Sequence, residues 1–349
     1  SDGRWVAVVT SGLNNVSSGS GVGYFYVLDA LTGAVLNKVS TGVGNSTAPS
    51  GLMHMSAFYN SALTDATMRF IYGGDQLGNV WRLDFGTTGG ACDAPATGTP
   101  PCISHLAQLT DGSSPIRVQP ITTRPALTTI KTAGNATGFR VLYIGTGRYL
   151  GDGLHGGLSD LSDPGSASGV AWLQSIYAIK DRNFDYGTTL RSGGNMVTQT
   201  LSLSGVSDRL ITKNPVDWDT KDGWLVDLIP IAADPSSAAG GERVNIDPRL
   251  ILGTLVIVTN TPAGGGSCAV GGSSRQYNLD YLTGGYIGNV QIVVGNFLGG
   301  TIAVGMAIVQ LQSSSIKDII TGADTSKTTT NVPPNSGNTS LKRFSYRER

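Results

Sequence analysis

The chain has 349 residues, of which 40% are hydrophobic, so it can bury a sizeable core and is not disordered as a whole. Its 24 basic side chains balance 24 acidic ones, which gives no global field to attract nucleic acid or an anionic membrane. The 49 glycines, together with the lack of any sustained 3.6-residue apolar period, predict an all-β fold with few helices.

A short pattern recurs four times along the chain: an alternating aromatic or aliphatic strand that ends in an acidic residue. The copies are YFYVLDALTG (24–33), NVWRLDF (79–85), SIYAIKD (175–181) and RQYNLDYLTG (275–284). The acid is Asp29, Asp84 and Asp280 in three copies, whereas the third copy has Lys180 at this place and Asp181 one residue later. The copies are related but uneven.

Further strand-like runs flank each copy of this pattern. A pair of runs precedes the second, third and fourth copies, and one run follows every copy. The following runs are VLNKVS (35–40), ISHLAQL (103–109), MVTQTLS (196–202) and VQIVV (290–294). Four short antiparallel strands per unit, with long loop insertions, predict a modified β-propeller built of four-stranded blades. A β-sandwich is the alternative.

The two ends of the chain differ from this unit. RWVAVVTSG (4–12) reads as the second strand of a blade, so we expect a fragment of a larger propeller, with an incomplete ring or one closed by a terminal strand. We assign residues 1–312 to the blades. Residues 313–349 are predicted to be an irregular Ser/Thr-rich segment, whose last part, KRFSYRER (342–349), could add a closing strand.

The longest uncharged stretch, residues 287–311, is long enough to span a bilayer. Asparagine, glutamine and glycine residues interrupt it, and its Val/Ile alternation favours two strands joined at Gly299 and Gly300. The sequence therefore predicts no membrane span.

The chain has three cysteines, so it can form at most one internal disulfide. Cys92 and Cys102 bracket the loop CDAPATGTPPC, whose length permits a bridge, and such a bridge would imply an oxidising compartment. Two free thiols are the alternative. Cys268 has no obvious partner, and none of the spacings fits a zinc site.

Several longer motifs then follow one another in a fixed order. They are YGGDQLGNVWRLDF (72–85), VLYIGTGRYL (141–150) followed by SIYAIKD, GWLVDL (223–228) followed by GERVNIDP (241–248), and FSYRE (344–348). Together they resemble the C-terminal propeller domain of the PilY/PilC family of type IV pilus tip proteins. The resemblance implies a secreted, non-catalytic protein at the pilus tip that assists pilus assembly or opposes retraction and mediates adhesion. The implied partners are minor pilins or other tip components, and a host or abiotic surface.

The same family commonly carries a calcium loop just ahead of the segment that matches YGGDQLGN. In residues 59–72 the alternate positions of such a loop fall on Ser61, Leu63, Asp65 and Arg69. Calcium prefers six to eight oxygen ligands with several carboxylates. Only Asp65 supplies a carboxylate, while Leu63 has no side-chain oxygen and Arg69 adds a positive charge. We therefore expect this site to be lost and expect no cofactor.

Other candidate chemistry is sparse. The three histidines share no metal-ligand spacing: His54, His105 and His155. The loop GDGLHGGLSDLSDP is the most acidic part of the chain and is either a cation or partner site or a solvated loop: Asp152, Asp160 and Asp163. GxSxG, HExxH and Walker motifs are missing from the sequence, so we predict that the protein is not an enzyme.

Three hypotheses follow for function. The first is a pilus tip and biogenesis module, outside the cell at the surface or the pilus tip, that binds its partners through three loop insertions: residues 87–101, 151–169 and 232–241. The second is a quinoprotein dehydrogenase, because such propellers share the strand-then-acid pattern. The third is a calcium-regulated factor for pilus retraction, which depends on the calcium loop described above.

The stretch IYGGDQLGNVWRLDF (71–85) resembles a ligand loop, but the repeat favours a structural interpretation. We expect Gly73-Gly74 and Gly78-Asn79 to turn the chain between two strands. Asp75 is placed to bind backbone amides of that turn, and Asp84 to close its strand as Asp29 does.

Overall fold

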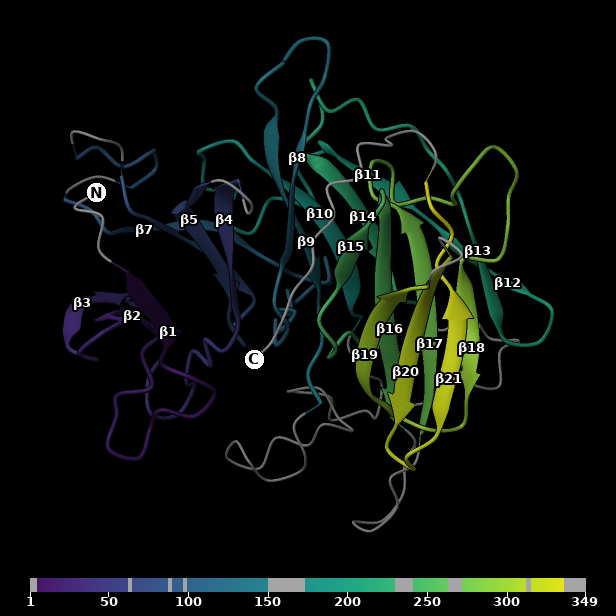
Figure 1. The fold of residues 1–349 in the computed structure, drawn as a ribbon, viewed down its shortest axis with the longest axis horizontal. Coiled ribbons are helices and arrows are strands. Elements are labelled where there is room, and N and C mark those ends of the chain that lie inside the picture. Colours follow the sequence, from purple (N-terminus) through teal and green to yellow (C-terminus); the bar gives the residue numbers. More distant parts are fainter. Residues whose placement is uncertain are drawn as a thin grey trace.

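The computed structural model describes residues 5–61, 65–86, 90–96, 99–149, 173–229, 241–262, 272–311 and 315–335. These residues form 21 strands in five sheets, and none of them is helical. Figure 1 shows the sheets following one another in chain order from the first to the last. The chain is therefore all-β, as its composition predicts.

The first two sheets contain the strands that the repeat predicts. The first sheet has three antiparallel strands, β1 (Val6–Thr10), β2 (Tyr24–Asp29) and β3 (Val35–Ser40). The second has four, in the order β4 (Met55–Ser61), β5 (Asp65–Gly74), β6 (Asn79–Asp84) and β7 (Cys102–Gln108). The second sheet is a complete blade, whereas the described part of the first sheet has no fourth strand.

The other three sheets are less regular. The third sheet has the order β11 (Met196–Gln199), β14 (Gly223–Asp227), β10 (Ser175–Asp181), β9 (Phe139–Gly145) and β8 (Ala126–Ile130). The fourth has the order β12 (Leu201–Ser204), β13 (Asp208–Ile211), β18 (Gly295–Gly299), β17 (Gly272–Asp280), β16 (Thr254–Pro262) and β15 (Arg249–Ile251). The fifth contains β19 (Ala303–Gln310), β20 (Ile316–Gly322) and β21 (Lys327–Asn331).

The sequence prediction is wrong for the fourth strand of the third blade. It places MVTQTLS beside β10, but β14 occupies this place, and β11 pairs in parallel with the far edge of β14. The place beside β10 is buried on both faces, which suits Trp224, Leu225 and Val226, while residues 196–198 of β11 remain partly exposed. The last residues of MVTQTLS enter the fourth sheet as β12.

Two further boundaries also differ from the prediction. VQIVV (290–294) is not a strand, and Val290 and Ile292 are exposed to solvent. Val294 accepts one backbone hydrogen bond from Asn278 of β17, at 2.9 Å, and the strand that pairs with β17 begins at residue 295. Residues 316–331 form β20 and β21 instead of an irregular segment. Alternate residues of β20 are buried, as a strand on the last sheet of a stack requires. The predicted closing strand, residues 342–349, lies outside the described residues.

Neighbouring sheets pack face to face, so the inner strands are buried on both faces. All residues of β6, β10 and β16 are buried. In β5, Ile71 packs with Phe25 of the first sheet, whereas Phe70 and Tyr72 pack with Leu142 of the third. In the first sheet, by contrast, only one face of β2 is buried.

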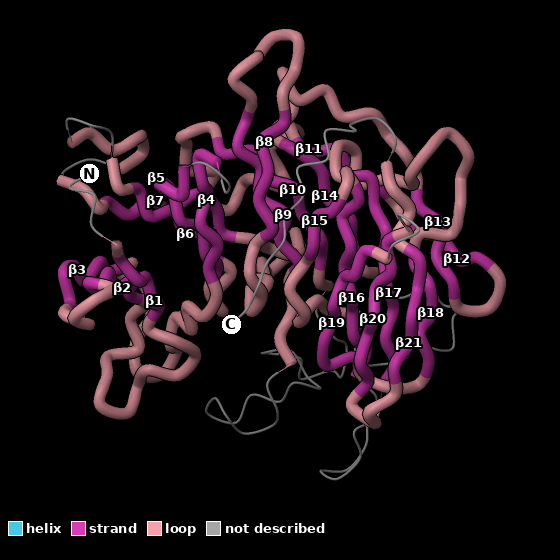
Figure 2. The backbone as a smooth tube through the Cα atoms, viewed as in Figure 1, coloured by secondary structure: helices cyan, strands magenta, loops and turns pink. Residues whose placement is uncertain are grey.

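The sheets are arranged around an arc, which Figures 1 and 2 show most clearly. Contacts between consecutive sheets join β3 to β7, β4 to β8, β8 to β15 and β16 to β19. The first and last sheets lie at opposite ends of this arc, so the described residues do not form a closed ring.

The uncharged residues 287–311 supply two strands, as predicted. Gly299 ends β18, and Gly300 lies between β18 and β19. The two strands belong to different sheets, so they do not form a hairpin. A helix with the length and hydrophobicity needed to cross a membrane is not found in the described part of the chain.

The turn between β5 and β6 is held by Asp75, as the sequence predicts. Its Oδ1 accepts hydrogen bonds from the amides of Leu77, at 3.0 Å, and Asn79, at 2.9 Å. Gly78 has a φ of 79°, a conformation that glycine adopts without strain. Trp81 also donates its indole N–H to Asp75, at 2.9 Å, so this turn is fixed to the core.

The prediction that Gly73 and Gly74 turn the chain is wrong, because both belong to β5. Asn79 likewise begins β6. A Cβ atom at Gly74 would lie 2.3 Å from Ile121 Cγ2. Glycine is needed at this position for the close approach of the segment before β8.

Candidate functional site

The acids that end the repeated strands share one local role. Each side chain accepts a hydrogen bond from the amide two residues later, which closes the turn. The distances are 2.9 Å for Asp29, 2.8 Å for Asp84, 2.8 Å for Asp181 and 2.9 Å for Asp280. The predicted role of Asp84 is confirmed. Asp84 and Asp181 have additional partners, and those of Asp181 join the second sheet to the third.

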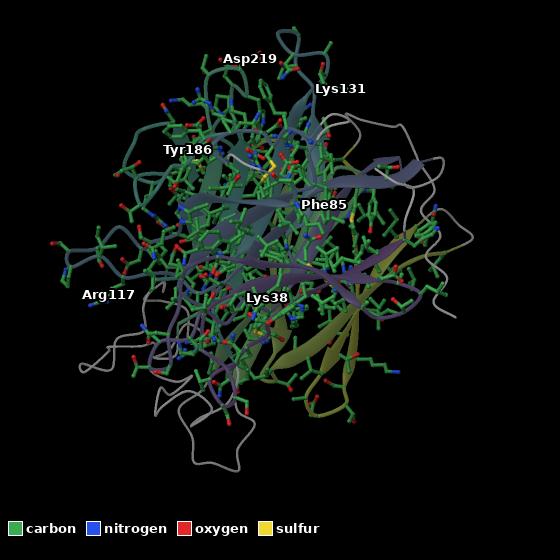
Figure 3. The ribbon with its side chains drawn as sticks, turned by 90° about the vertical axis from the view of Figure 1, so that its left-hand side faces the viewer. Lys38, Phe85, Arg117, Lys131, Tyr186 and Asp219 are labelled. Carbon is green, nitrogen blue, oxygen red and sulfur yellow. A yellow bond between two sulfur atoms is a disulfide. The ribbon has the colours of Figure 1, made fainter. Side chains whose placement is uncertain are left out.

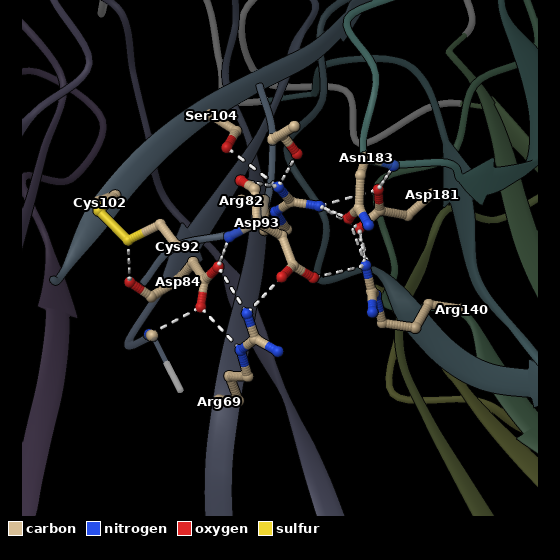
Figure 4. Close-up of polar contacts among 12 residues, drawn as sticks. Arg69, Arg82, Asp84, Cys92, Asp93, Cys102, Ser104, Arg140, Asp181 and Asn183 are labelled. Atoms are coloured by element: carbon tan, nitrogen blue, oxygen red, sulfur yellow. Dashed lines mark hydrogen bonds and ion pairs between the residues drawn. A yellow bond between two sulfur atoms is a disulfide. The ribbon is translucent and has the colours of Figure 1, made fainter. Parts of the chain in front are cut away.

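Asp181 forms a fully buried ion pair with Arg82. Arg82 Nη1 lies 2.8 Å from Asp181 Oδ2, and neither side chain is exposed to solvent. Arg82 is on β6 and Asp181 ends β10, so the pair connects two blades. Figure 4 shows the two side chains pointing toward each other between the sheets. A buried pair of this kind is strongly destabilised when one partner is removed.

Two further side chains bind the same carboxylate. Tyr72 donates its hydroxyl to Asp181 at 2.7 Å, and Arg140 Nη2 lies 3.3 Å from it. Burial alone would raise the pKa of Asp181, but Arg82 and Arg140 hold it below its usual value. Burial and the neighbouring Asp181 raise the pKa of Tyr72 well above its usual value. The carboxylate is therefore charged and the phenol neutral at physiological pH.

A second group of charges lies beside the first. Arg69 Nε lies 3.1 Å from Asp84 Oδ1, and Arg69 also binds Asp93. The guanidinium groups of Arg69 and Arg140 lie 4.6 and 4.2 Å from the centre of the Phe70 ring. We call the following residues the interblade charge cluster: Arg69, Arg82, Arg140, Asp84, Asp93 and Asp181.

Cys92 and Cys102 form a disulfide with a Cα–Cα distance of 6.4 Å. It attaches the loop after β6 to the start of β7 and lies beside the charge cluster (Figure 4). Arg82 Nη2 donates to the backbone carbonyl oxygens of Asp93, at 2.9 Å, and of Ala94. The disulfide therefore holds the segment that supplies these acceptors.

The charge cluster is suited to joining the second and third sheets. Its three arginines and three aspartates balance in charge, and every one of them is paired. A metal ion prefers several unpaired oxygen, nitrogen or sulfur ligands. Among the described residues, no group of three or more His, Cys, Asp or Glu side chains could hold a metal ion.

A polar cavity of about 430 Å³ lies next to the cluster and is lined partly by Arg140, Lys180 and Arg182. Each of these cations has a partner. Lys180 Nζ donates to the carbonyl oxygen of Trp218 at 2.7 Å, and Arg182 Nη1 lies 2.9 Å from Asp222. Burial lowers the pKa of Lys180. The cavity is therefore a weak candidate for an anion site.

The structure describes only part of the predicted calcium loop. Arg69 belongs to the charge cluster, so its positive charge is used to pair with carboxylates. Ser61 and Asp65 are opposite each other at the ends of β4 and β5. Leu63 and the side chains of Ser61 and Asp65 lie outside the described residues. The expected loss of the calcium site remains a prediction.

Most other predicted sites also lie outside the described part of the chain: Asp152, Asp160, Asp163, His155 and Cys268. Of the histidines, His105 Nδ1 lies 2.9 Å from Asp185 and its Nε2 lies 3.2 Å from Asn79 Oδ1. Its ring also contacts Trp81. His105 is therefore held in a hydrogen-bond network.

Arg82 and Arg140 are site residues that were not predicted from the sequence. Both arginines could have been recognised, because each occurs in an otherwise apolar strand, NVWRLD and FRVLYIG. An arginine in a strand that is buried on both faces needs a buried acid.

Comparison with known proteins assigns the fold to a family. The family model described as the PilY1 beta-propeller domain matches residues 1–212. The chain belongs to this family. Strands β14 to β21 lie beyond the matched residues. The resemblance to PilY/PilC propellers stated from the sequence motifs is thereby confirmed.

Individual PilY1 proteins are similar over most of the chain. The type IV pilus biogenesis factor PilY1 of Pseudomonas aeruginosa PAO1 is 25% identical over 312 residues, which cover 81% of this chain and 24% of that protein. A PilY1 homologue of Xylella fastidiosa is 25% identical over 313 residues, covering 83% of this chain and 18% of that protein. The chain thus spans at most about a quarter of the length of these relatives.

A solved structure shows the same fold. The crystal structure of the Pseudomonas aeruginosa PilY1 C-terminal domain superposes with a TM-score of 0.68 at 21% sequence identity. The match covers 95% of this chain and 70% of that one. The similarity therefore extends through the five sheets, including the part beyond the family model.

Proposed function

We propose that this chain is the propeller module of a type IV pilus biogenesis factor. The observation that carries the proposal is its membership of the PilY1 propeller family, together with relatives named type IV pilus biogenesis factors. The module acts outside the cell, at the cell surface or the pilus tip. The disulfide between Cys92 and Cys102 supports an oxidising location.

The module works by binding and not by catalysis. This part of the proposal is supported by the charge cluster, in which each acid and each arginine is already paired. Its partners are minor pilins or other tip components, and it mediates adhesion to a host or abiotic surface. The loop insertions at residues 87–101, 151–169 and 232–241 supply the contacts, because long loops in compact domains are commonly functional.

The test replaces residues 151–169 with a Gly/Ser segment of the same length in the full protein. The variant is produced in cells that lack their own copy, and surface piliation and adhesion are measured. We expect a normal level of secreted protein with reduced piliation or adhesion. The same replacement at residues 232–241 is the matched comparison. Unchanged piliation and adhesion in both variants would contradict binding through these loops.

The proposal also predicts that the module needs neither a quinone nor calcium at residues 61–69. An absorbance spectrum after addition of a quinone cofactor tests the dehydrogenase alternative, and a bound chromophore would revive it. Calorimetric titration with calcium tests the retraction-regulator alternative. We expect no tight binding at this loop, and tight binding that Asp65→Ala abolishes would restore a calcium-regulated role.

A further inference from the structure

A second cavity opens on the outer face of the first sheet. It has a volume of about 760 Å³ and is lined by residues of β1, β2 and β3 and by the loop between β1 and β2. We call it the first-sheet pocket. Its lining consists of Val9, Thr10, Ser11, Asn15, Ser17, Ser18, Gly19, Ser20, Tyr24, Tyr26 and Lys38. Small-ligand sites in proteins have volumes of this order.

The alternation of β2 places two tyrosines in this pocket. Phe25 and Val27 point to the core between the first and second sheets. Tyr24 and Tyr26 therefore point to the opposite face, and their ring centres lie 6.0 Å apart. Tyr26 is opposite Lys38 of β3 in the strand register. Figure 3 views the molecule from the side on which Lys38 lies.

Lys38 is held above these rings, and no acidic side chain in the described part of the chain pairs with it. Its Nζ lies 4.1 Å from the centre of the Tyr24 ring and 5.7 Å from that of Tyr26. None of the carboxylates in the described residues forms an ion pair with it, and the pocket lining contains no acid. This differs from the charge cluster, where each arginine has a carboxylate. The pocket thus presents one oriented positive charge.

Hydroxyl groups surround this charge. Six of the lining side chains carry one: Ser11, Ser17, Ser18, Ser20, Tyr24 and Tyr26. The hydroxyl of Thr10 is already used, because it donates to the carbonyl oxygen of Met53 at 2.6 Å. Ser11 and Ser20 accept hydrogen bonds from the amides of Tyr24 and Val22, which leaves their hydroxyl hydrogens available to donate. Asn15 donates to the carbonyl oxygen of Val22, at 2.7 Å, which fixes the loop over the sheet.

We propose that the first-sheet pocket binds a carboxylated sugar unit of the uronic acid type. Lys38 binds the carboxylate, and the serine and tyrosine hydroxyls bind the sugar hydroxyls. The single positive charge of Lys38 neutralises one carboxylate, whereas a phosphate dianion would keep an unpaired negative charge. This inference rests on the proposed function, because it names a surface ligand for the adhesion step.

The test measures binding of two soluble probes, glucuronate and glucose, to the purified chain by saturation-transfer difference NMR. We expect glucuronate to bind about fivefold more tightly than glucose, because only glucuronate can pair with Lys38. Lys38→Met should abolish this preference while leaving the glucose signal unchanged. Tyr26→Ala should weaken both probes.

The matched control is Lys131→Met, since Lys131 is also exposed and is well separated from Lys38 in Figure 3. It should bind both probes like the unmodified chain, and thermal unfolding of each variant verifies folding. Equal affinity for the two probes, no binding of either, or a preference that survives Lys38→Met would overturn the proposal. Binding of a glutamate-containing peptide more tightly than glucuronate would overturn it in favour of a protein partner. Piliation in cells is a separate readout, so loss of sugar binding with normal piliation would leave the biogenesis role standing.

Discussion

Two interfaces between sheets place acids in opposite electrostatic environments. Between the second and third sheets, Asp181 is buried against Arg82 and Arg140. Between the fourth and fifth sheets, Asp318 of β20 is also buried, but its partner is the neutral Gln276 of β17, at 2.9 Å. Ile316 and Ile320 flank Asp318 along β20 and belong to apolar clusters, and Thr330 lies opposite it in β21. Both carboxylates are buried, so the direction in which the pKa shifts depends on whether a cationic partner opposes the effect of burial.

The difference predicts opposite responses to pH. The pKa of Asp181 is lowered, so its contribution to stability is present above the unfolded value of 3.8 and is lost as the pH falls below it. Burial raises the pKa of Asp318 to about 6, although the hydrogen bond from Gln276 acts in the other direction. The folded chain then binds more protons than the unfolded chain between pH 3.8 and about 6, so this interface gains stability as the pH falls through that window.

The largest expected effect is that of Asp181→Ala. It leaves the buried Arg82 without its carboxylate and should lower the free energy of unfolding by about 3–5 kcal/mol, measured by denaturant unfolding. Arg124→Ala is the control, because Arg124 is 52% exposed in its pair with Asp247, which is itself 26% exposed. That exposed pair should contribute less than about 1 kcal/mol. Equal losses in the two variants would show that the charge cluster is unimportant.

Loss of the disulfide should have the next largest effect. Replacing Cys92 and Cys102 with alanine opens a loop of 10 residues in sequence separation, for which chain entropy predicts a loss of about 3 kcal/mol. The same double variant should increase hydrogen exchange around Asp93 and Ala94, whose carbonyl groups accept from Arg82. Unchanged exchange there would show that the disulfide does not support the cluster.

Asp318→Asn should produce a smaller change of the opposite sign. Because the amide carries no charge to bury, the variant should be more stable than the unmodified chain at pH 7.5, by about 1–2 kcal/mol. It should also lose the gain in stability between pH 6 and 4, which is measured by thermal unfolding across this range. Asp324→Asn, at an exposed turn, is the control and should keep that gain. A variant with the same pH profile as the unmodified chain would contradict the raised pKa.

Local patterns allowed much of the fold to be predicted from the sequence. Strands that end in an acid were recognisable because Asp29, Asp84 and Asp280 bind amides of their own turns, an interaction that depends on neighbouring residues only. The contact between Asp75 and its turn was predictable for the same reason.

Contacts between distant residues could not be predicted in this way. Arg82 and Asp181 are 99 residues apart in the sequence, and the residues next to each of them do not indicate which partner it has. The sequence also placed β11 beside β10, where the structure has β14. This could not be predicted for a similar reason, because burial on both faces of a strand is decided by the neighbouring sheets. The first-sheet pocket likewise needs three strands and a loop to come together.

A double-mutant cycle on Arg82 and Asp181 tests most directly the claim that the charge cluster joins the second and third sheets. The variants are Arg82→Met, Asp181→Leu and the two combined, and the free energy of unfolding is measured for each. We predict that each single change costs about 3–5 kcal/mol and that the combined change costs clearly less than their sum, because no unpaired buried charge remains in the pair. If the loss in the double variant equals the sum of the two single losses to within about 0.5 kcal/mol, Arg82 and Asp181 do not interact directly, which would contradict an ion pair that joins the two sheets.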